Sequence, residues 1–297
     1  MNRSGTIGHC QGDIETASGF VYAAFQMPQD IITPVTRNMD LGLGNFLVEF
    51  EAPQMIASMK PAQFFMLGIP GSEVLLRRPF SVCGLPGTFD DSPPGRAQVL
   101  YRVHGKGTAL LASLKPGAPL EVLGPLGRGF ELSRAPEVLP LFVAGGIGSA
   151  PFPALAAMMN RKKTRPTMIY GARTGSELPL LDWFREHCNE VMVTTDDGSL
   201  GERGVVTQPL ERALDDLEPD RVHVYACGPE PMLREVARIT VSRRIRCDLS
   251  LEARMACGFG VCLGCVVPTH GGGPDGDRGF ERVCVEGPVM RAERLAW

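Results

Sequence analysis

The sequence has no long run of charge of one sign, and this absence excludes two classes of partner. Its 33 acidic and 30 basic residues give a formal net charge of -3 and are mixed along the chain. Proteins that bind nucleic acid or an anionic membrane usually concentrate positive charge in one segment or on one face. We therefore expect neither nucleic acid nor a membrane as a partner.

The sequence also lacks an uninterrupted apolar stretch long enough to span a membrane. Residues 138–159 carry no charge, but three glycines and three prolines interrupt them. Because these residues disrupt a spanning helix, the stretch predicts a buried strand, a loop and a helix. The first thirty residues lack the basic start and apolar run of a secretory signal, so we expect a cytoplasmic location.

Two different patterns of apolar residues divide the chain and predict a multidomain α+β fold. From residue 31 to 134, short apolar runs alternate with glycine and proline, which predicts an antiparallel β-barrel. From 135 to 245, strand and helix patterns alternate, which predicts an α/β domain with a parallel sheet. Residues 246–297 form a small C-terminal domain in this interpretation, and residues 1–30 are an N-terminal extension without an assignment.

Four cysteines near the C-terminus give the strongest functional signal. Cys257, Cys262 and Cys265 lie within nine residues, and Cys284 follows after eighteen more. This spacing is typical of plant-type [2Fe–2S] proteins, in which a compact loop wraps the cluster and a distant cysteine closes it. Structural zinc usually takes two short-spaced pairs, and only Cys262 and Cys265 form one here. We predict a [2Fe–2S] cluster, with zinc as the alternative.

A glycine-rich turn in the second region is a candidate for binding a dinucleotide. Residues 144–151, AGGIGSAP, follow an apolar strand and precede a helix. Gly145, Gly146 and Gly148 therefore let phosphates approach the amides at the helix N-terminus. The turn is not the GxGxxG fingerprint, and an ordinary tight turn between strand and helix is the alternative.

A second turn, residues 226–232, lies at the carboxyl end of a later strand. Ligands of open parallel sheets bind at this end, so Cys227 and Gly228 are candidates for contact with a nucleotide. A buried thiol without a ligand is the alternative for Cys227.

Two stretches of the barrel region combine groups that suit a flavin nucleotide. They are Arg77-Arg-Pro-Phe-Ser-Val82 and Tyr101-Arg-Val-His-Gly-Lys-Gly-Thr108. An arginine can form paired hydrogen bonds with a pyrophosphate, an aromatic ring can cover a flavin, and a hydroxyl can bond its polar edge. A surface arginine and a core phenylalanine are the alternatives for Arg78 and Phe80.

Seven segments in this order make the chain similar to the ferredoxin-reductase superfamily, and within it to the electron-transfer subunits of NAD-linked dihydroorotate dehydrogenases. They are RPFS, GKGT, LGPLGRGF, AGGIGSAP, TTDDGSLGERGVVT, ACGPEPML and the pair EARMACGFGVCLGCVV and VCVEGPV. The similarity runs from about residue 31 to the end. It implies a FAD-binding β-barrel, an NAD-binding α/β domain and a [2Fe–2S] domain.

The resemblance also implies a role for each candidate residue. Arg78 would meet the FAD pyrophosphate, with Pro79, Phe80 and Ser81 at the ribityl and flavin region and Gly105, Gly107 and Thr108 at the phosphates. Gly145, Gly146 and Gly148 would face the NAD phosphates, with Cys227 and Gly228 near the nicotinamide and Cys227 helping to place it. Cys257, Cys262, Cys265 and Cys284 would hold the cluster.

We therefore predict an oxidoreductase subunit that serves pyrimidine biosynthesis. Electrons from dihydroorotate would pass from the FMN of a separate catalytic subunit through the [2Fe–2S] cluster and FAD to NAD+. The complex would be a heterotetramer with two copies of each subunit, and the base that acts on the pyrimidine would belong to the partner. One alternative is the same module serving a hydrogenase or a ferredoxin-linked transhydrogenase, and another is a zinc-stabilised, nucleotide-binding regulator. Arg173 leaves NADP open beside NAD, because it could meet a 2′-phosphate.

Overall fold

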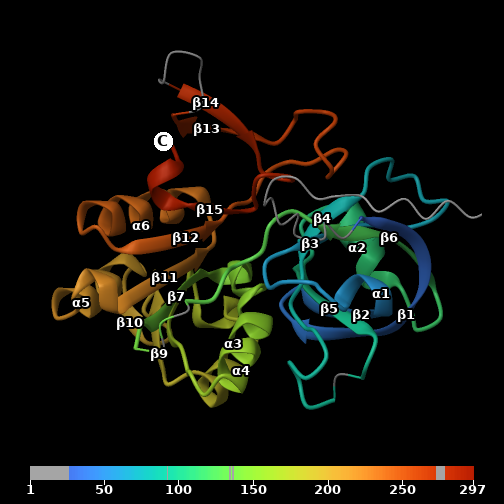
Figure 1. The fold of residues 1–297 in the computed structure, drawn as a ribbon. Helices are drawn as coiled ribbons and strands as arrows, with labels where there is room; N and C mark the ends of the chain where they lie inside the picture. Colours follow the sequence, from blue (N-terminus) through green and yellow to red (C-terminus); the bar gives the residue numbers. More distant parts are fainter. Residues whose placement is uncertain (1–26, 92, 134, 136, 272–277) are drawn as a thin grey trace, which may run out of the picture.

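The computed structural model describes residues 27–271 and 278–297, except residues 92, 134 and 136. Most of the N-terminal extension and of the GGGPDGDRG insertion therefore lies outside the described residues. The rest forms a barrel, a larger sheet covered by helices and a hairpin that carries the C-terminal cysteine region (Figure 1).

The barrel is a six-stranded antiparallel sheet in the order β4-β3-β6-β1-β2-β5. A bridge between Gly84 and Gln98 joins the segment after β4 to β5, so the sheet curls until it is nearly closed. Apolar side chains such as Phe50 and Phe65 fill its interior, where their rings meet edge to face at 5.3 Å. The elements are β1 (Gln29–Gly42), β2 (Asn45–Glu51), α1 (Pro53–Ile56), β3 (Phe64–Gly68), β4 (Arg78–Ser81), β5 (Arg96–Arg102), α2 (Lys106–Ser113) and β6 (Pro119–Leu126).

The second sheet has seven strands in the order β10-β9-β8-β7-β11-β12-β15, and all its pairs are parallel except that of β12 with β15. This confirms the predicted parallel sheet. Its strands are β7 (Leu139–Gly145), β8 (Thr167–Ala172), β9 (Glu190–Thr195), β10 (Glu202–Arg203), β11 (Val222–Cys227), β12 (Arg246–Ser250) and β15 (Val289–Arg291). From β7 the chain continues to β8 on one side, and from β11 it continues to β12 on the other side. The connections after these two neighbouring strands therefore lead in opposite directions, and ligands of such sheets usually bind in the crevice at the carboxyl ends of the two strands.

Helices cover both faces of this sheet because successive strand residues point to opposite sides. Leu141 and Val143 of β7 pack with α5 (Thr207–Asp215) and α6 (Glu230–Ser242). Phe142 and Ala144 pack with α3 (Phe152–Arg161) and α4 (Leu181–His187). Strand β7, the turn after it and α3 are the buried strand, loop and helix predicted for residues 138–159. In the described part of the chain, no helix is long and apolar enough to cross a membrane.

The region predicted as a small C-terminal domain shares its structure with the second sheet. β12 and β15, both within residues 246–297, are the last two strands of that sheet. Between them, β13 (Val266–His270) and β14 (Arg278–Arg282) form a separate antiparallel hairpin. The sequence pattern gave no sign of this sharing because β15 has only three residues, and it is held by pairing with a strand forty residues away.

Candidate flavin, nucleotide and cluster sites

A cavity of about 380 Å³ lies where the barrel, the parallel sheet and the segment before the first cluster cysteine meet. Its volume is in the range of small-molecule sites, and its walls are mainly apolar with a few polar groups. Six of the predicted site residues line it: Pro79, Phe80, Ser81, Thr108, Gly148 and Cys227. The structure thus brings together, in one cavity, motifs that lie almost 150 residues apart in the sequence.

Arg78 and its neighbour Arg77 have opposite electrostatic surroundings. Arg77 pairs with Asp30 at 2.7 Å and with Glu121 at 3.1 Å. Arg78 donates to the carbonyl oxygen of Leu76, and among the described residues no carboxylate pairs with it. The guanidinium of Arg78 is therefore the one that remains available for an anion.

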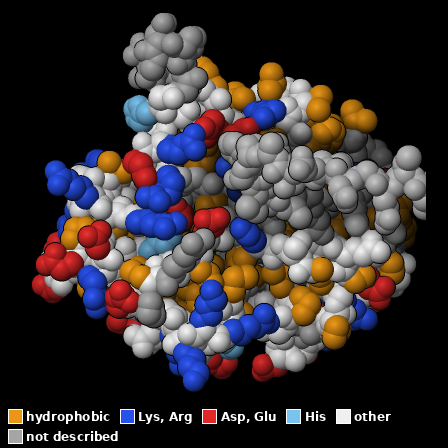
Figure 2. Space-filling view, in the orientation of Figure 1, with side chains coloured by type: hydrophobic (Ala, Val, Ile, Leu, Met, Phe, Trp, Pro, Cys, Tyr) orange, Lys and Arg blue, Asp and Glu red, His pale blue; other side chains and the backbone are white. Residues whose placement is uncertain are grey.

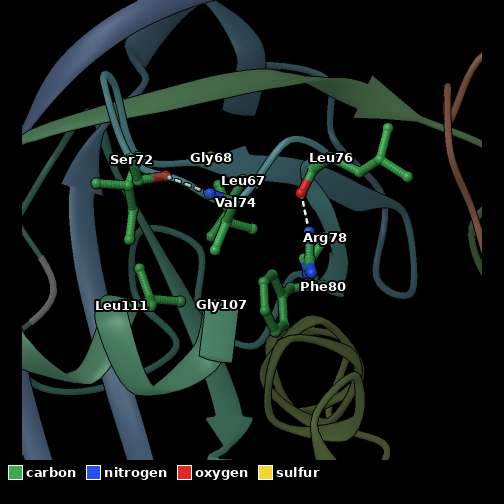
Figure 3. Close-up of a pocket in the computed structure, with 10 residues that line it drawn as sticks. Leu67, Gly68, Ser72, Val74, Leu76, Arg78, Phe80, Gly107 and Leu111 are labelled. Atoms are coloured by element: carbon green, nitrogen blue, oxygen red, sulfur yellow. Dashed lines mark hydrogen bonds between the residues drawn. The ribbon is translucent and has the colours of Figure 1, made fainter. Parts of the chain in front are cut away.

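Arg78 lies beside the start of α2. Together with Phe80 and Gly107 it lines a small hollow of about 20 Å³, and Figure 3 shows these side chains next to one another at the first turn of the helix. A Cβ on Gly107 would come within 2.9 Å of Nε of Arg78. Glycine at this position therefore lets the arginine lie close to the helix N-terminus, where two positive features can act on one phosphate group.

The hydroxyl of Thr108 holds the loop that leads into α2. It accepts hydrogen bonds from the amides of His104 at 2.9 Å and Gly105 at 3.1 Å, and it donates to the carbonyl of Gly105 at 3.0 Å. A Cβ on Gly105 would meet open space, so steric crowding does not explain the glycine there. In this structure Thr108 shapes the loop through its hydroxyl and also lines the cavity.

The two nucleotide loops pack against each other through their glycines. A Cβ on Gly148 would lie 2.5 Å from the carbonyl oxygen of Cys227, and one on Gly145 would lie 2.8 Å from Cδ of Pro229. A Cβ on Gly228 would lie 3.0 Å from the backbone nitrogen of Gly145. These three glycines are therefore required by contact between the loops.

Gly146 differs from the other predicted glycines. Its φ is +52°, which favours glycine, and a Cβ there would have no atom within 4 Å. It opens the 3₁₀ turn Gly146–Ser149, directly after β7. Of the four glycines predicted to contact NAD, Gly146 is the one with open space at its Cβ position, which leaves room for a phosphate to approach.

Cys227 is a buried thiol at the carboxyl end of β11. It is 4% exposed, and burial raises its pKa far above the ordinary value, so it is a neutral group at physiological pH. Its side chain bonds with Ser250, the neighbouring residue on β12. The thiol therefore contributes shape and a weak hydrogen bond to the cavity, and it carries no negative charge.

The structure adds a carboxyl group that the sequence analysis missed. Glu252 lines the cavity close to Cys227, and burial raises the pKa of its carboxyl group. No motif marks Glu252, because it lies in the short connection between β12 and the cysteine loop and reaches the cavity only through the fold. Its unusual environment is a feature of functional carboxyl groups.

The four C-terminal cysteines lie together as two pairs. The thiols of Cys257 and Cys262 interact, and so do those of Cys265 and Cys284. Over the described residues, no group of three or more potential ligands converges as a single metal ion would require. Tetrahedral zinc needs four ligands around one point, whereas a [2Fe–2S] cluster has two irons and takes cysteines on both. The paired arrangement fits the cluster better than zinc.

Backbone amides surround the first cluster cysteine. Burial opposes ionisation of Cys257, but hydrogen bonds from the amides of Cys262, Phe259 and Val261 outweigh burial and lower its pKa to about 6. The amide nitrogen of Cys262 lies 3.5 Å from Sγ of Cys257. Amides directed at sulfur stabilise the thiolate form that iron binds.

The cysteine loop lies against the barrel. Gly258 has a φ of +80°, and a Cβ there would come within 2.5 Å of Met66 on β3. Met255, two residues before Cys257, lines the cavity of about 380 Å³, which we call the flavin-sized cavity. The cavity and the cysteine loop are thus separated by only a short piece of chain.

Comparisons with known proteins agree with this geometry. Residues 252–296 match the family model for the iron-sulfur cluster binding domain of dihydroorotate dehydrogenase B, and residues 142–238 match that of the oxidoreductase NAD-binding domain. All four predicted cluster cysteines lie in the first range, and all residues predicted to bind NAD lie in the second. The predictions of iron–sulfur and NAD binding are therefore confirmed at the level of domains.

Two solved structures share the fold. The structure of an NADH-dependent reduced ferredoxin-NADP oxidoreductase, described in connection with flavin-based electron bifurcation, covers 89% of this chain and 90% of its own, with 27% identity and a TM-score of 0.74. A ferredoxin NADP+ reductase from Neisseria gonorrhoeae with bound FAD and NADP covers 72% of this chain and 91% of its own, with 18% identity and a TM-score of 0.60. The chain therefore has a ferredoxin-reductase-like fold.

Curated relatives cover most of the chain. The electron transfer subunit of dihydroorotate dehydrogenase B (NAD(+)) from Caldanaerobacter subterraneus subsp. tengcongensis is 38% identical over 79% of this chain and 86% of its own length. The subunit of the same name from Geobacillus kaustophilus is 40% identical over 78% of this chain and 85% of its own length. At this identity and coverage, the chain belongs to the family of dihydroorotate dehydrogenase B (NAD(+)) electron transfer subunits.

Proposed function

We propose that this chain transfers electrons between NAD(H) and the FMN of a dihydroorotate dehydrogenase catalytic subunit, in pyrimidine biosynthesis. One observation carries the proposal: a single cavity joins residues 79–81 of the barrel, both nucleotide loops and the segment that leads to Cys257. When bound there, FAD supplies two-electron chemistry toward the nicotinamide and one-electron chemistry toward the [2Fe–2S] cluster. NAD is the nucleotide in the names of the curated relatives.

The barrel residues bind and orient FAD in this proposal. Arg78, which has no carboxylate partner among the described residues, and the first amides of α2 hold the pyrophosphate. Phe80 packs edge to face on Tyr101 at 5.8 Å, so its ring is fixed where it lines the cavity. Ser81 supplies a hydroxyl to the same wall.

Arg173 favours NAD over NADP through its own ion pair. Its Nε and one terminal nitrogen lie 3.0 and 2.6 Å from the two carboxylate oxygens of Glu177. Glu177 also bonds Arg102, which lines the cavity, at 2.8 Å. Two donors of the Arg173 guanidinium are held by Glu177 in this way, so a 2′-phosphate would have to compete with Glu177 for them.

The nucleotide loops place the nicotinamide. Gly146 leaves room for phosphate, and the contact of Gly148 with Cys227 fixes the two loops relative to each other. Cys227 and Glu252 then form a polar part of the wall: burial raises the pKa of the Cys227 thiol far enough to keep it neutral, and burial also raises the pKa of the Glu252 carboxyl group. This wall shapes the space beside the flavin.

The cysteine loop and the hairpin of β13 and β14 present an apolar surface for a partner. Five apolar side chains of these segments are exposed, and Figure 2 shows hydrophobic side chains on the upper part of the molecule. They are Phe259, Val261, Leu263, Val266 and Phe280. Exposed apolar groups around a redox centre suit a protein interface that excludes water. We propose that the FMN-containing catalytic subunit docks here, in a heterotetramer with two copies of each subunit.

The proposal is tested by removing one cluster ligand. Cys284→Ser should lose iron, because a serine oxygen is a harder ligand than thiolate. In the complex with the catalytic subunit, reduction of NAD+ by dihydroorotate should fall to background, while NADH oxidation by a small soluble dye persists. Cys188→Ser, at a buried cysteine outside the motif, is the matched control. Stoichiometric zinc in the native protein, or normal electron transfer by a cluster-free variant, would contradict the proposal.

The similarity to the bifurcating oxidoreductase supports a second candidate, the same electron-transfer module on a different partner. Purification of the native complex separates the two candidates. A bound FMN protein that oxidises dihydroorotate supports the first, and a bound ferredoxin-linked enzyme or hydrogenase supports the second.

A further inference from the structure

Two hollows lie at the edge of the second sheet opposite the nucleotide loops. Their volumes are about 540 and 590 Å³, and Ser133, Val138 and His223 line both. His223 is at the amino end of β11, whereas Cys227 of the flavin-sized cavity is at its carboxyl end. We name the hollow of about 540 Å³ the amino-edge hollow. The proposed electron transfer makes no use of it.

His223 is buried at the amino-edge hollow with one ring nitrogen unused. Its side chain is 1% exposed, and its Nε2 lies 2.8 Å from Oδ2 of Asp248. The ring packs on Tyr225 with a centroid distance of 3.9 Å. Its Nδ1 is buried and has no hydrogen-bond partner among the residues that the structure describes. A buried polar atom without a partner is costly, so Nδ1 is expected to have one that the described residues do not supply.

The tautomer of His223 defines what that partner must offer. Burial lowers the pKa of the ring, against the opposing effect of Asp248, while Arg246 and Arg291 lower it further. The ring is therefore neutral at physiological pH. Because Nε2 faces a carboxylate, the proton lies on Nε2, and Nδ1 carries a lone pair. Nδ1 needs a donor such as a hydroxyl group.

The same hollow has N–H donors that its carboxylates do not engage. Arg244, Arg246 and Arg291 line it together with the carboxylates of Asp220 and Glu293. Arg246 and Arg291 each approach Asp248 at only 3.5 Å, and the Nε atoms of both are buried without a hydrogen-bond partner in the described structure. Glu293 pairs with Arg291 at 2.8 Å, and no ion pair involves Arg244 within the described ranges. Each guanidinium carries five N–H donors, so many remain free for an anion.

We propose that the amino-edge hollow binds a small oxyanion that carries at least one hydroxyl group. The arginine N–H groups donate to its charged oxygens, and Nδ1 of His223 accepts from its hydroxyl. Hydrogen phosphate has both features, as does a phosphate ester of a polyol, whereas sulfate has no hydroxyl at neutral pH. The site therefore discriminates between two anions of nearly equal size and shape.

Calorimetric titration of the full chain with phosphate and with sulfate tests this proposal. The protein carries its flavin and cluster and is saturated with NAD+, so that added anions do not enter the nucleotide cavity, and ionic strength is matched. Phosphate should bind about tenfold more tightly than sulfate, since sulfate leaves Nδ1 unpaired. Glycerol 3-phosphate in a parallel titration distinguishes the free ion from an ester: whichever binds more tightly identifies the natural class.

Two further measurements locate the binding. Arg244→Gln, at an exposed position, should weaken phosphate binding about tenfold, whereas Arg221→Gln, exposed nearby but outside the lining, should leave it unchanged. In the unaltered protein labelled with ¹⁵N-histidine, phosphate and not sulfate should shift the Nδ1 resonance of His223. Equal affinity for the two anions, an Arg244→Gln variant that matches the control, or the absence of saturable phosphate binding would overturn the proposal.

Discussion

Residues 144–151 and 256–265 are two glycine-rich loops: the first lines the flavin-sized cavity, and the second begins directly after the lining residue Met255. In the cysteine loop, Gly258 and Gly260 have φ values of +80° and +92°, so the backbone itself requires glycine as it turns around the cluster position. In the nucleotide loop, Gly148 has an ordinary φ, but a Cβ would collide with the backbone of Cys227. The comparison teaches that Gly258 and Gly260 are required by the curvature of their loop, whereas Gly148 is required by the contact of its loop with another.

The largest effect on electron transfer is expected from a substitution of Arg78. In the proposed function both loops act on electrons that pass through FAD, so loss of FAD affects both. Arg78→Ala removes charge-assisted hydrogen bonds to pyrophosphate, each worth about 1.5–3 kcal/mol, so two such bonds correspond to a loss of roughly a hundredfold or more in FAD affinity. The flavin content of the purified variant measures the effect. Arg77→Ala is the matched control, because Arg77 is already paired with Asp30 and Glu121. Equal FAD content in both variants would show that Arg78 is a surface arginine that does not bind FAD.

A substitution in the cysteine loop should damage the cluster alone. In Gly260→Ala, the left-handed backbone costs about 1–2 kcal/mol, and the new Cβ would lie 2.6 Å from Cγ2 of Val285. Iron and sulfide per chain should fall, while FAD content and dye reduction by NADH stay near the wild-type values. Metal analysis and visible absorption check this result. A variant with a full cluster would show that the loop tolerates a different path.

The matching substitution in the nucleotide loop should show the opposite pattern. Gly148→Ala would force the loop away from the backbone of Cys227, because backbone atoms cannot move aside as a flexible side chain can. Displacement of a reacting group by about 1 Å can cost about 10²-fold, so flavin reduction by NADH should slow by roughly ten- to a hundredfold. Stopped-flow absorption measures the rate. Gly146→Ala, with open space at its Cβ, separates strain from collision, and loss of iron in either variant would break the comparison.

The smallest effect concerns the pH dependence of stability at Glu252. Burial raises the pKa of this carboxyl group in the folded state. The stability that its neutral form contributes is therefore fully present below the ordinary carboxyl pKa and is lost as pH rises through the raised value. Glu252→Gln keeps the shape and removes the titration. Its Tm should exceed that of the wild type at about pH 8, and the difference should shrink toward about pH 4. A difference that is constant with pH would mean that Glu252 does not titrate with folding.

The sequence alone determined the general architecture and predicted the cluster ligands. Cys257, Cys262, Cys265 and Cys284 follow a spacing typical of [2Fe–2S] proteins, so their grouping can be predicted without a structure. The alternation of strands and helices after residue 135 also determined the parallel sheet, because the periodicity of burial is local. Both features depend on residues close together in the chain.

Only the tertiary structure decided which polar groups stand alone and which are paired. Arg77 and Arg78 are identical in sequence terms, and the fold supplies carboxylates from two distant strands to only one of them. Glu252 reaches the cavity, and His223 meets Asp248, through strand pairing between β11 and β12. Burial and pairing depend on residues far apart in sequence, so no local pattern encodes them. They set the charge and the hydrogen-bonding capacity of both the flavin-sized cavity and the amino-edge hollow.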